Sequence, residues 1–195
     1  MPNEILIKEQ DGSPKQIVFA DHATDFAPTA ANDLRITTDG TKETDVQFLF
    51  EGVTNNSYRQ STKVDLGATR APAYHVRAAL EFAATPTAGN VVELYWAPSV
   101  SGTAGTANPG AASGADSAYT GYSSNADAAV KQLIHIGNFV CTAQATATIQ
   151  VADIGVFSPP ERYGSLVVKN ASGATMHSDS VEINIVFDPI LPEVQ

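Results

Sequence analysis

The sequence predicts an all-β fold: an antiparallel β-sandwich, jelly-roll-like, with one short helix and one long loop of small residues. Short segments rich in β-branched and aromatic residues recur along the chain, separated by Gly, Pro, Asn and Asp turns roughly every 8–15 residues. Two of these segments, residues 74–82 and 91–96, alternate as a strand with one buried face does. Charged residues make up only 16% of the chain, a composition that suits strands and small-residue loops better than helices.

The N-terminal part contains several short strand candidates. Residues 4–8 and 15–20 are predicted to form a small hairpin. Residues 21–31 are irregular, and we expect either an arm on a neighbouring subunit or a loop on the chain's own body. The next segments are predicted as strands at 34–37 and 46–50, a helical turn or loop at 55–62, and a connection at 63–67 that enters the following strand through Pro72.

Residues 74–82 and 91–96 are predicted to pair as an antiparallel hairpin, because Pro86 and Gly89 mark a turn between them. Trp96 shares one face of the second strand with Val92 and Leu94, so we expect it in the core.

A long stretch without strand pattern follows, from residue 97 to residue 125. These 29 residues contain five Gly, seven Ala, six Ser, three Thr and two Pro, but only one charged residue, Asp116. With so few large apolar side chains, this segment cannot form a core of its own, because their burial would not offset the conformational entropy lost on ordering it. We expect an excursion across the surface or onto a neighbour, with Tyr119 and Tyr122 as its anchors.

Residues 125–133 form the best helix candidate, with Asn125 as its N-cap and Asp127 near the positive end of the helix. The helix is short, so it must pack on another element. The remaining strands are predicted at 134–141, 146–151, 154–157, 163–169 and 181–187, the last ended by Pro189 and Pro192.

Length and charge limit the organisation and the partners. We expect residues 1–45 to form an N-terminal hairpin or arm, separate or part of the same domain, and residues 46–195 to form the sandwich domain. The net charge of −10 argues against nucleic acid as a partner. The sequence contains no run of about 18 apolar residues, so it predicts no membrane span. The N-terminus lacks a signal-peptide pattern, so we expect a protein that is made in the cytoplasm and not secreted.

The sequence carries no catalytic or metal-binding signature, and we expect neither enzyme activity nor a cofactor. The four histidines are scattered, and the Ser, His and Asp of residues 177–180 are neighbours on a strand or turn, which does not make a triad. Cys141 lies in an apolar run and is predicted to be a buried, inert thiol. A carbohydrate-binding module remains an alternative, with Tyr95, Trp96 and Tyr119 as residues that would stack on a sugar.

Several segments resemble small virion structural proteins of tailed bacteriophages. The resemblance covers residues 63–195 and is carried by DLGATRAP (65–72), LYWAPS (94–99), NPG (108–110), SGAD (113–116) with AYTG (118–121), and RYGSLVVKN (162–170). It implies a repeated, non-enzymatic part of the virion.

Within that class we favour a capsid decoration or cement protein on the outer head surface. Such proteins, often trimers, bridge capsomers, so the implied partners are the major capsid protein and copies of the chain itself. A tail, collar or fibre-associated protein is the alternative. The residues that we expect to contact a neighbour are Phe26, Pro28, Tyr119, Tyr122, Pro189 and Leu191.

Overall fold

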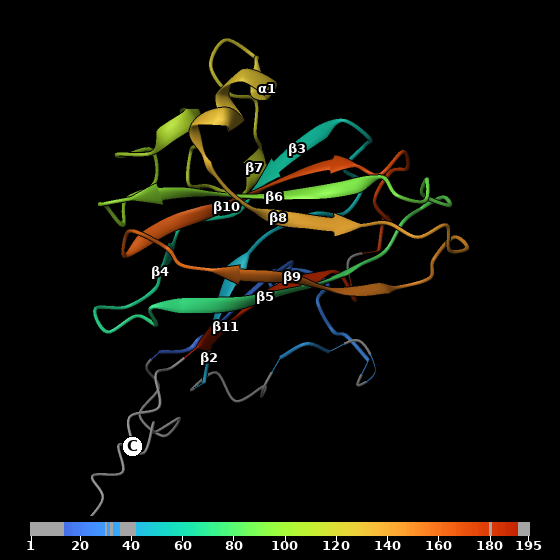
Figure 1. The fold of residues 1–195 in the computed structure, drawn as a ribbon, viewed down its shortest axis with the longest axis horizontal. Helices are drawn as coiled ribbons and strands as arrows, with labels where there is room; N and C mark the ends of the chain where they lie inside the picture. The colour runs from blue at the N-terminus through green and yellow to red at the C-terminus, as the bar shows by residue number, and fades with distance from the viewer. Residues whose placement is uncertain (1–13, 30, 32, 36–41, 180, 191–195) are drawn as a thin grey trace, which may run out of the picture.

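The computed structural model describes residues 14–29, 31, 33–35, 42–179 and 181–190, which form two β-sheets packed face to face (Figure 1). The five-stranded sheet contains, in spatial order, β2 (Glu43–Gln47), β1 (Gln16–Ala20), β11 (Asn184–Ile190), β5 (Ala73–Leu80) and β9 (Gln150–Phe157). The six-stranded sheet contains β7 (Ser117–Ala118), β3 (Ser57–Gln60), β10 (Tyr163–Ala171), β6 (Val91–Ser99) and β8 (Ile134–Val140), with β4 (Val64–Asp65) paired to β10. Of the strand pairs in the described chain, β1–β2 alone is parallel. The predicted all-β sandwich is confirmed.

The order of the strands is that of a jelly roll. Without the short strands β2, β4 and β7, the described part of the chain contributes eight strands to two sheets. Counted along the chain, the first, eighth, third and sixth strands form one sheet (β1, β11, β5 and β9), and the second, seventh, fourth and fifth form the other (β3, β10, β6 and β8). This is the double-sheet arrangement that two Greek keys produce.

The predicted hairpin between residues 74–82 and 91–96 is wrong. The first segment is β5, which pairs with β11 and β9 in the five-stranded sheet. The second is β6, which pairs with β10 and β8 in the six-stranded sheet. The chain therefore crosses from one sheet to the other between them. Both strands do have the predicted alternation of buried and partly exposed residues, because the period-two pattern identifies a buried face and not a partner strand.

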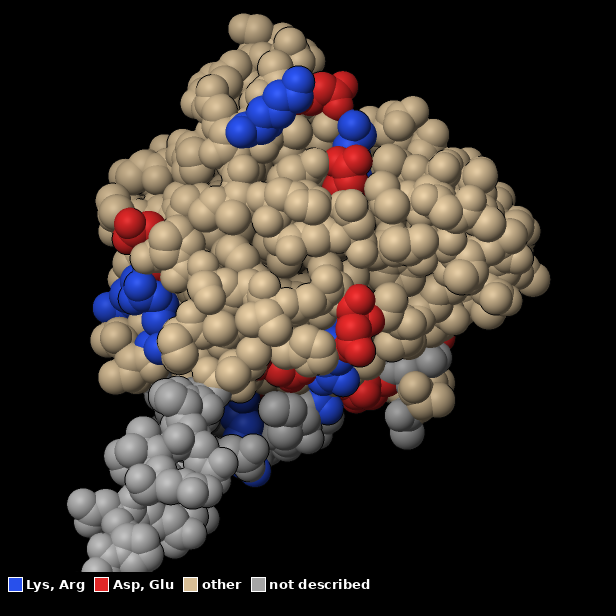
Figure 2. Space-filling view, in the orientation of Figure 1, with Lys and Arg blue, Asp and Glu red and all other residues tan. Residues whose placement is uncertain are grey.

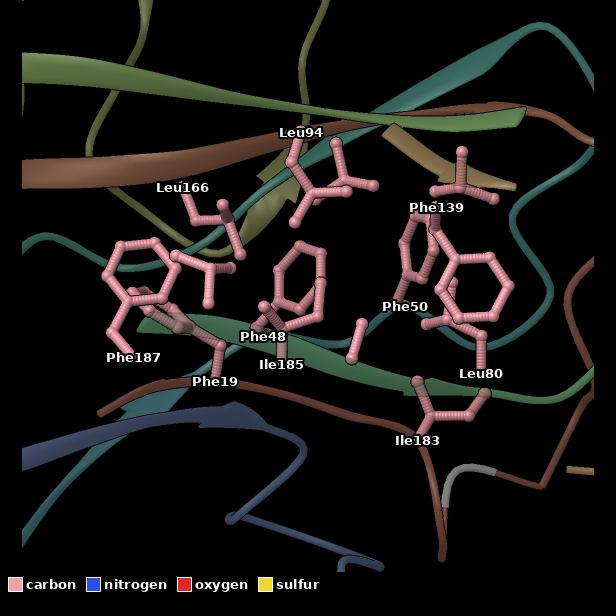
Figure 3. Packing of buried hydrophobic residues seen from close by; sticks show 14 of the residues in the cluster. Phe19, Phe48, Phe50, Leu80, Leu94, Phe139, Leu166, Ile183, Ile185 and Phe187 are labelled. Carbon is pink, nitrogen blue, oxygen red and sulfur yellow. The ribbon is translucent and has the colours of Figure 1, made fainter. Parts of the chain in front are cut away.

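The core fills the space between the sheets with aliphatic and aromatic side chains from both (Figure 3). Trp96 is fully buried, as predicted, and its ring lies 5.8 Å from the rings of both Phe157 and Phe187. Gly164 on the neighbouring strand β10 makes room for it, because a Cβ at that position would lie 2.2 Å from Trp96 Cζ2. The absence of a side chain at Gly164 is thus a condition for placing the indole ring between the sheets.

The N-terminal strands differ in part from the prediction. β1 agrees with the strand predicted at 15–20 and lies inside the sheet, between β2 and β11. Its predicted hairpin partner, residues 4–8, lies outside the described residues. β2 covers Glu43–Gln47 and not 46–50, and β3 forms where a helical turn or loop was predicted. β3 becomes a strand because Tyr58 and Gln60, both buried, alternate with more exposed neighbours across a sheet surface.

Two C-terminal expectations also need correction. Two separate strands were predicted at 146–151 and 154–157, but residues 150–157 form one strand, β9, with a register shift at Ile154. Residues 146–149 belong to the preceding loop. Pro189 does not end the last strand, because β11 continues to Ile190. Pro189 is tolerated there because the pairing of β11 with β1 stops at Phe187, so its missing N–H interrupts no bond on that edge.

The predicted helix is present, although it is shorter than expected. α1 covers Ala126–Ala129 and continues as the 3₁₀ turn η3, Val130–Gln132. Asn125 caps it as predicted, accepting a hydrogen bond from the Ala128 amide at 3.1 Å. None of the helices in the described chain has the length and apolar character needed to span a bilayer.

Candidate functional site

The two sheets meet along one side of the sandwich, where their edge strands β8 and β9 run next to each other (Figure 1). The strands touch at Gly137, where an added Cβ would lie 2.7 Å from Ile154 Cγ2. β8 pairs only with β6 and β9 only with β5, so neither outer edge has a strand partner within the described residues. We call residues 134–157, which comprise β8, β9 and the loop between them, the β8–β9 surface.

Four of the seven large apolar residues that the described chain exposes lie on these two strands. By strand register, Val140 lies on the outer face of the six-stranded sheet, and Val151 and Val156 lie on the outer face of the five-stranded sheet. Ile134 and Val140 lie near the two ends of β8, and Val151 and Val156 near the two ends of β9, with exposed fractions of 37%, 57%, 51% and 65%. The other large apolar residues that the described chain exposes, Val100, Tyr122 and Ile190, lie on other elements. Single exposed apolar residues need no explanation, but four of them on two adjacent edge strands make both sides of this seam apolar, which marks it as a candidate contact region.

The same surface is almost free of charge. Residues 134–157 contain one carboxylate, Asp153, and no Lys, Arg or Glu, in a chain with 21 acidic and 11 basic residues. Asp153 lies 3.4 Å from His75 Nε2, which can offset its charge when the imidazole is protonated. Figure 2 shows that most of the surface over these strands belongs to uncharged residues. A partner can cover this region with little desolvation of charge.

A pocket of about 300 Å³ opens where β8 ends and β9 begins. Gln150 closes the loop behind it, accepting a hydrogen bond from the Thr142 amide at 2.8 Å and donating one to the Thr142 carbonyl at 3.0 Å. The lining is apolar or neutral and contains no ionisable side chain: Phe139, Val140, Thr142, Gln144, Ile149, Gln150, Val151 and Ala152. The pocket is therefore suited to an apolar or amide group and offers no acid, base or nucleophile.

The long stretch from residue 97 to residue 125 is ordered on the chain's own body. Tyr119 is 2% exposed, packs in a cluster with Tyr58 and Leu133, and donates its hydroxyl hydrogen to the Gly110 carbonyl at 2.5 Å. The expectation that Tyr119 contacts a neighbour is therefore wrong, and its burial raises its pKa to about 12. Tyr122, by contrast, is 53% exposed and accessible.

A lysine ammonium organises the most Gly-rich part of this stretch. Lys63 Nζ lies 2.9 Å from each of the carbonyl oxygens of Ser101, Thr103 and Thr106, which can accept its three hydrogens, and 3.0 Å from Ser99 Oγ. These bonds supply the order that a segment without large apolar residues does not obtain from packing. Burial lowers the pKa of Lys63.

The other predicted contact residues are in part held by their own subunit. Phe26 is half-buried against the outer face of the five-stranded sheet, and the Arg35 guanidinium lies 5.0 Å from its ring centre. Arg77 donates to the Leu34 carbonyl at 3.2 Å, which fastens the same segment. The described part of residues 21–35, with Pro28 half-buried in it, therefore follows the chain's own body. Pro189 is half-buried in β11, and Leu191 lies outside the described residues.

The histidines and carboxylates of the described residues do not converge on one point. His22, His75 and His177 lie 3.6, 3.4 and 3.8 Å from Asp45, Asp153 and Glu81, at three separate places in the fold. His177 Nδ1 accepts a hydrogen bond from the Asp179 amide at 3.2 Å, which is a turn and not a triad. No group of three or more potential metal ligands occurs in the described ranges.

No protein-family model, no curated protein and no solved structure matches this chain. Its function has to be inferred from its own residues and fold. The β8–β9 surface was not singled out from the sequence, although one signal was present: residues 134–157 lack Lys, Arg and Glu over a length that includes two strands.

Cys141, next to the pocket, is 1% exposed, as predicted. Burial raises the pKa of its thiol to about 11, so the thiolate is scarce at neutral pH.

Proposed function

We propose that this protein is a non-enzymatic structural subunit of a tailed-bacteriophage particle, and within that class a capsid decoration protein that binds the major capsid protein on the outer head surface. The observation that carries the binding role is the β8–β9 surface, which combines exposed apolar side chains, a nearly uncharged surround and two strand edges without a partner in the described chain. Surfaces of this kind bind protein segments by apolar contact and by adding strands.

Three of the segments that carry the resemblance to phage structural proteins lie next to each other in the fold. Asp65 accepts hydrogen bonds from Arg162 Nε and Nη2 at 2.7 and 2.6 Å, and the strands that contain Trp96 and Gly164 are direct neighbours. These segments belong to β4, β6 and β10 of the six-stranded sheet and to the residues next to them. The resemblance thus concerns the framework, and we assign the contact with the particle to the β8–β9 surface.

The chain's charge fits a position outside the shell. Packaged DNA presses outward on a capsid, and a subunit that adds buried area across the seams between capsomers opposes that pressure. A net charge of −10 disfavours contact with the genome. We propose that the protein is made in the host cytoplasm and joins the head there.

The direct test is addition of the purified protein to expanded capsids that lack it. We expect saturation at a fixed ratio to the major capsid protein and a higher melting temperature of the shell. A matched pair of variants localises the contact. Val151→Asp on the β8–β9 surface should weaken binding. Val100 is 71% exposed outside this surface, and Val100→Asp should leave binding unchanged. Failure of the wild-type protein to bind expanded capsids contradicts the proposal.

Copy number separates this proposal from the tail or collar alternative. A decoration protein occurs in hundreds of copies per particle, and a collar or tail component in six to a few dozen, so quantitative gel analysis of purified virions decides between them. The carbohydrate-binding alternative loses two of its three predicted aromatic residues, because Trp96 is fully buried and Tyr119 is 2% exposed. The third, Tyr95, is partly buried and donates its hydroxyl hydrogen to Glu93.

A further inference from the structure

The turn of residues 99–106 surrounds one point with oxygen atoms. The carbonyl oxygens of Ser101, Thr103 and Thr106 lie 2.9 Å from Lys63 Nζ, and Ser99 Oγ lies 3.0 Å from it. We call these four oxygens the ammonium cage. An ammonium group has three hydrogens and the cage offers four oxygens. The arrangement therefore suits a compact positive charge and does not depend on one fixed set of directed hydrogen bonds.

Backbone hydrogen bonds hold the cage in shape without Lys63. The Thr106 amide donates to the Thr103 carbonyl at 3.3 Å, which closes the turn. Gly105, with a φ of +72°, donates its amide hydrogen to the Ser113 carbonyl at 2.6 Å, which ties the turn to the rest of the long stretch. The cage is thus built largely by the backbone, and Lys63 supplies the charge at its centre.

All four cage oxygens are uncharged, which favours a monovalent cation as the ligand. Ca²⁺ and Mg²⁺ sites use carboxylates and have oxygen distances of about 2.0–2.6 Å. Rings of backbone carbonyl oxygens, by contrast, are the ligands of K⁺ in channel filters. Residues 97–125 contain a single carboxylate, Asp116, and it is paired with Arg59 at 2.8 Å. The cage distances of 2.9–3.0 Å match the hydrogen bonds of an ammonium group.

The lysine stem lies in a channel that leads to the cage. Gly114 borders this channel, because a Cβ at that position would lie 3.1 Å from Lys63 Cε and 3.4 Å from Lys63 Cβ. On the other side of the cage, Thr103 and Thr106 are exposed. Truncation of Lys63 to alanine would therefore leave a space that connects the solvent with the four oxygens.

We propose that the ammonium cage is a binding site for monovalent cations and small primary ammonium ions, which the chain fills with its own Lys63 Nζ. A tethered ammonium group has a high effective concentration, so free cations do not replace it in the wild type. They take its place when the side chain is shortened, and the order of residues 101–106 then depends on their concentration. This inference does not rest on the proposed function, since the cage lies outside the β8–β9 surface.

The test is limited proteolysis of the full-length Lys63→Ala protein with proteinase K in chloride salts of equal ionic strength. Truncation should speed cleavage within residues 101–106, and n-propylammonium should reverse this effect best, because it replaces the part of the side chain that was removed. NH₄⁺ and K⁺ should also restore protection. Tetramethylammonium, which is larger and has no N–H, should not. With a Kd on the order of 10 mM, a cation at about 100 mM would slow cleavage about tenfold.

Three further variants separate binding in the cage from a general effect of salt. Lys63→Met keeps most of the stem and places its methyl group beside the cage, so no cation should restore its protection. Lys131→Ala removes an exposed lysine from η3, and its cleavage should not respond to the choice of cation. Lys63→Gly lengthens the empty channel by one carbon, so the best ligand should change from n-propylammonium to n-butylammonium.

Four outcomes of the proteolysis overturn the inference: unchanged cleavage of Lys63→Ala, no restoration by any cation, equal restoration by tetramethylammonium, or equal restoration of Lys63→Met. Melting temperatures in the same salts show whether the truncated proteins fold. Failure of both Lys63→Ala and Lys63→Gly to fold in every salt would also contradict the inference, because a bound cation should restore the fold. Crystals of Lys63→Ala grown with Rb⁺ give an independent result. An anomalous peak between the four cage oxygens is expected, and its absence at saturating Rb⁺ would count against the site. None of these results bears on capsid binding by the wild type.

Discussion

Substitution of Gly164 by Ala should strongly destabilise the fold, although it adds a single methyl group. The new Cβ would lie 2.2 Å from Trp96 Cζ2 and 2.3 Å from Cε2, distances at which one of the two groups must move. The indole ring is fully buried and packs against the rings of Phe157 and Phe187, which also contact each other, so the ring has little room to move. The strain has to be taken up by the strand pair β6–β10 or by the facing sheet.

The expected magnitude follows from overpacking in a close-packed core. Inserted methyl groups in such cores cost about 1–3 kcal/mol, and a clash with a buried aromatic ring belongs at the upper end. For a chain of 150–250 residues each kcal/mol lowers Tm by about 2–4 °C, so a loss of about 3 kcal/mol predicts a decrease of roughly 6–12 °C. Thermal and urea unfolding, followed by circular dichroism, measure both quantities.

Two comparisons isolate the clash with Trp96. Gly102→Ala is the matched control, because its Cβ would contact the edge of the half-exposed Tyr163 ring at 3.0 Å, and we expect a Tm change of less than about 2 °C. In the Trp96→Phe background the penalty of Gly164→Ala should fall by at least about 1 kcal/mol, a coupling expected of residues in contact. An unchanged Tm for Gly164→Ala, or equal penalties in both backgrounds, would refute the packing argument.

Alkaline pH should weaken the contact between Tyr58 and Asp127. Burial and the hydrogen bond to Asp127, 2.5 Å long, raise the pKa of Tyr58 to about 12. The folded-state pKa exceeds the unfolded value of about 10, so the stabilisation is complete below about pH 10 and is lost as the pH rises through about 12. Urea unfolding of wild type and Tyr58→Phe should converge over that range, and a constant difference would contradict it. Cys141, buried with a pKa of about 11, should react with DTNB only as fast as the protein unfolds; rapid labelling of the native state would show otherwise. Lys63→Met should make residues 101–106 sensitive to proteinase K, because three carbonyl oxygens lose the ammonium group that they share. Lys131→Met is the control, and equal resistance of both variants would rule out this role.

Which parts of the fold were predictable depends on the range of the interactions that decide them. The burial of Trp96 and Cys141 and the cap at Asn125 follow from local periodicity and side-chain chemistry, and the structure confirms all three. β3 was missed because Tyr58 and Gln60 are buried by the long stretch of residues 97–125 and by a neighbouring strand, and no local sequence pattern indicates such burial. The hairpin between residues 74–82 and 91–96 failed for a related reason, since β5 and β6 face the same core from opposite sheets.

The sequence by itself determined the all-β class, the apolar faces of the strands and the lack of Lys, Arg and Glu in residues 134–157. Only the tertiary structure decided that β8 and β9 are edge strands and lie next to each other. The physical reason is that every strand offers the same backbone donors and acceptors on both edges. Whether an edge stays open depends on the order of strands that are distant in the chain, and the candidate surface exists only because that order leaves these two edges side by side.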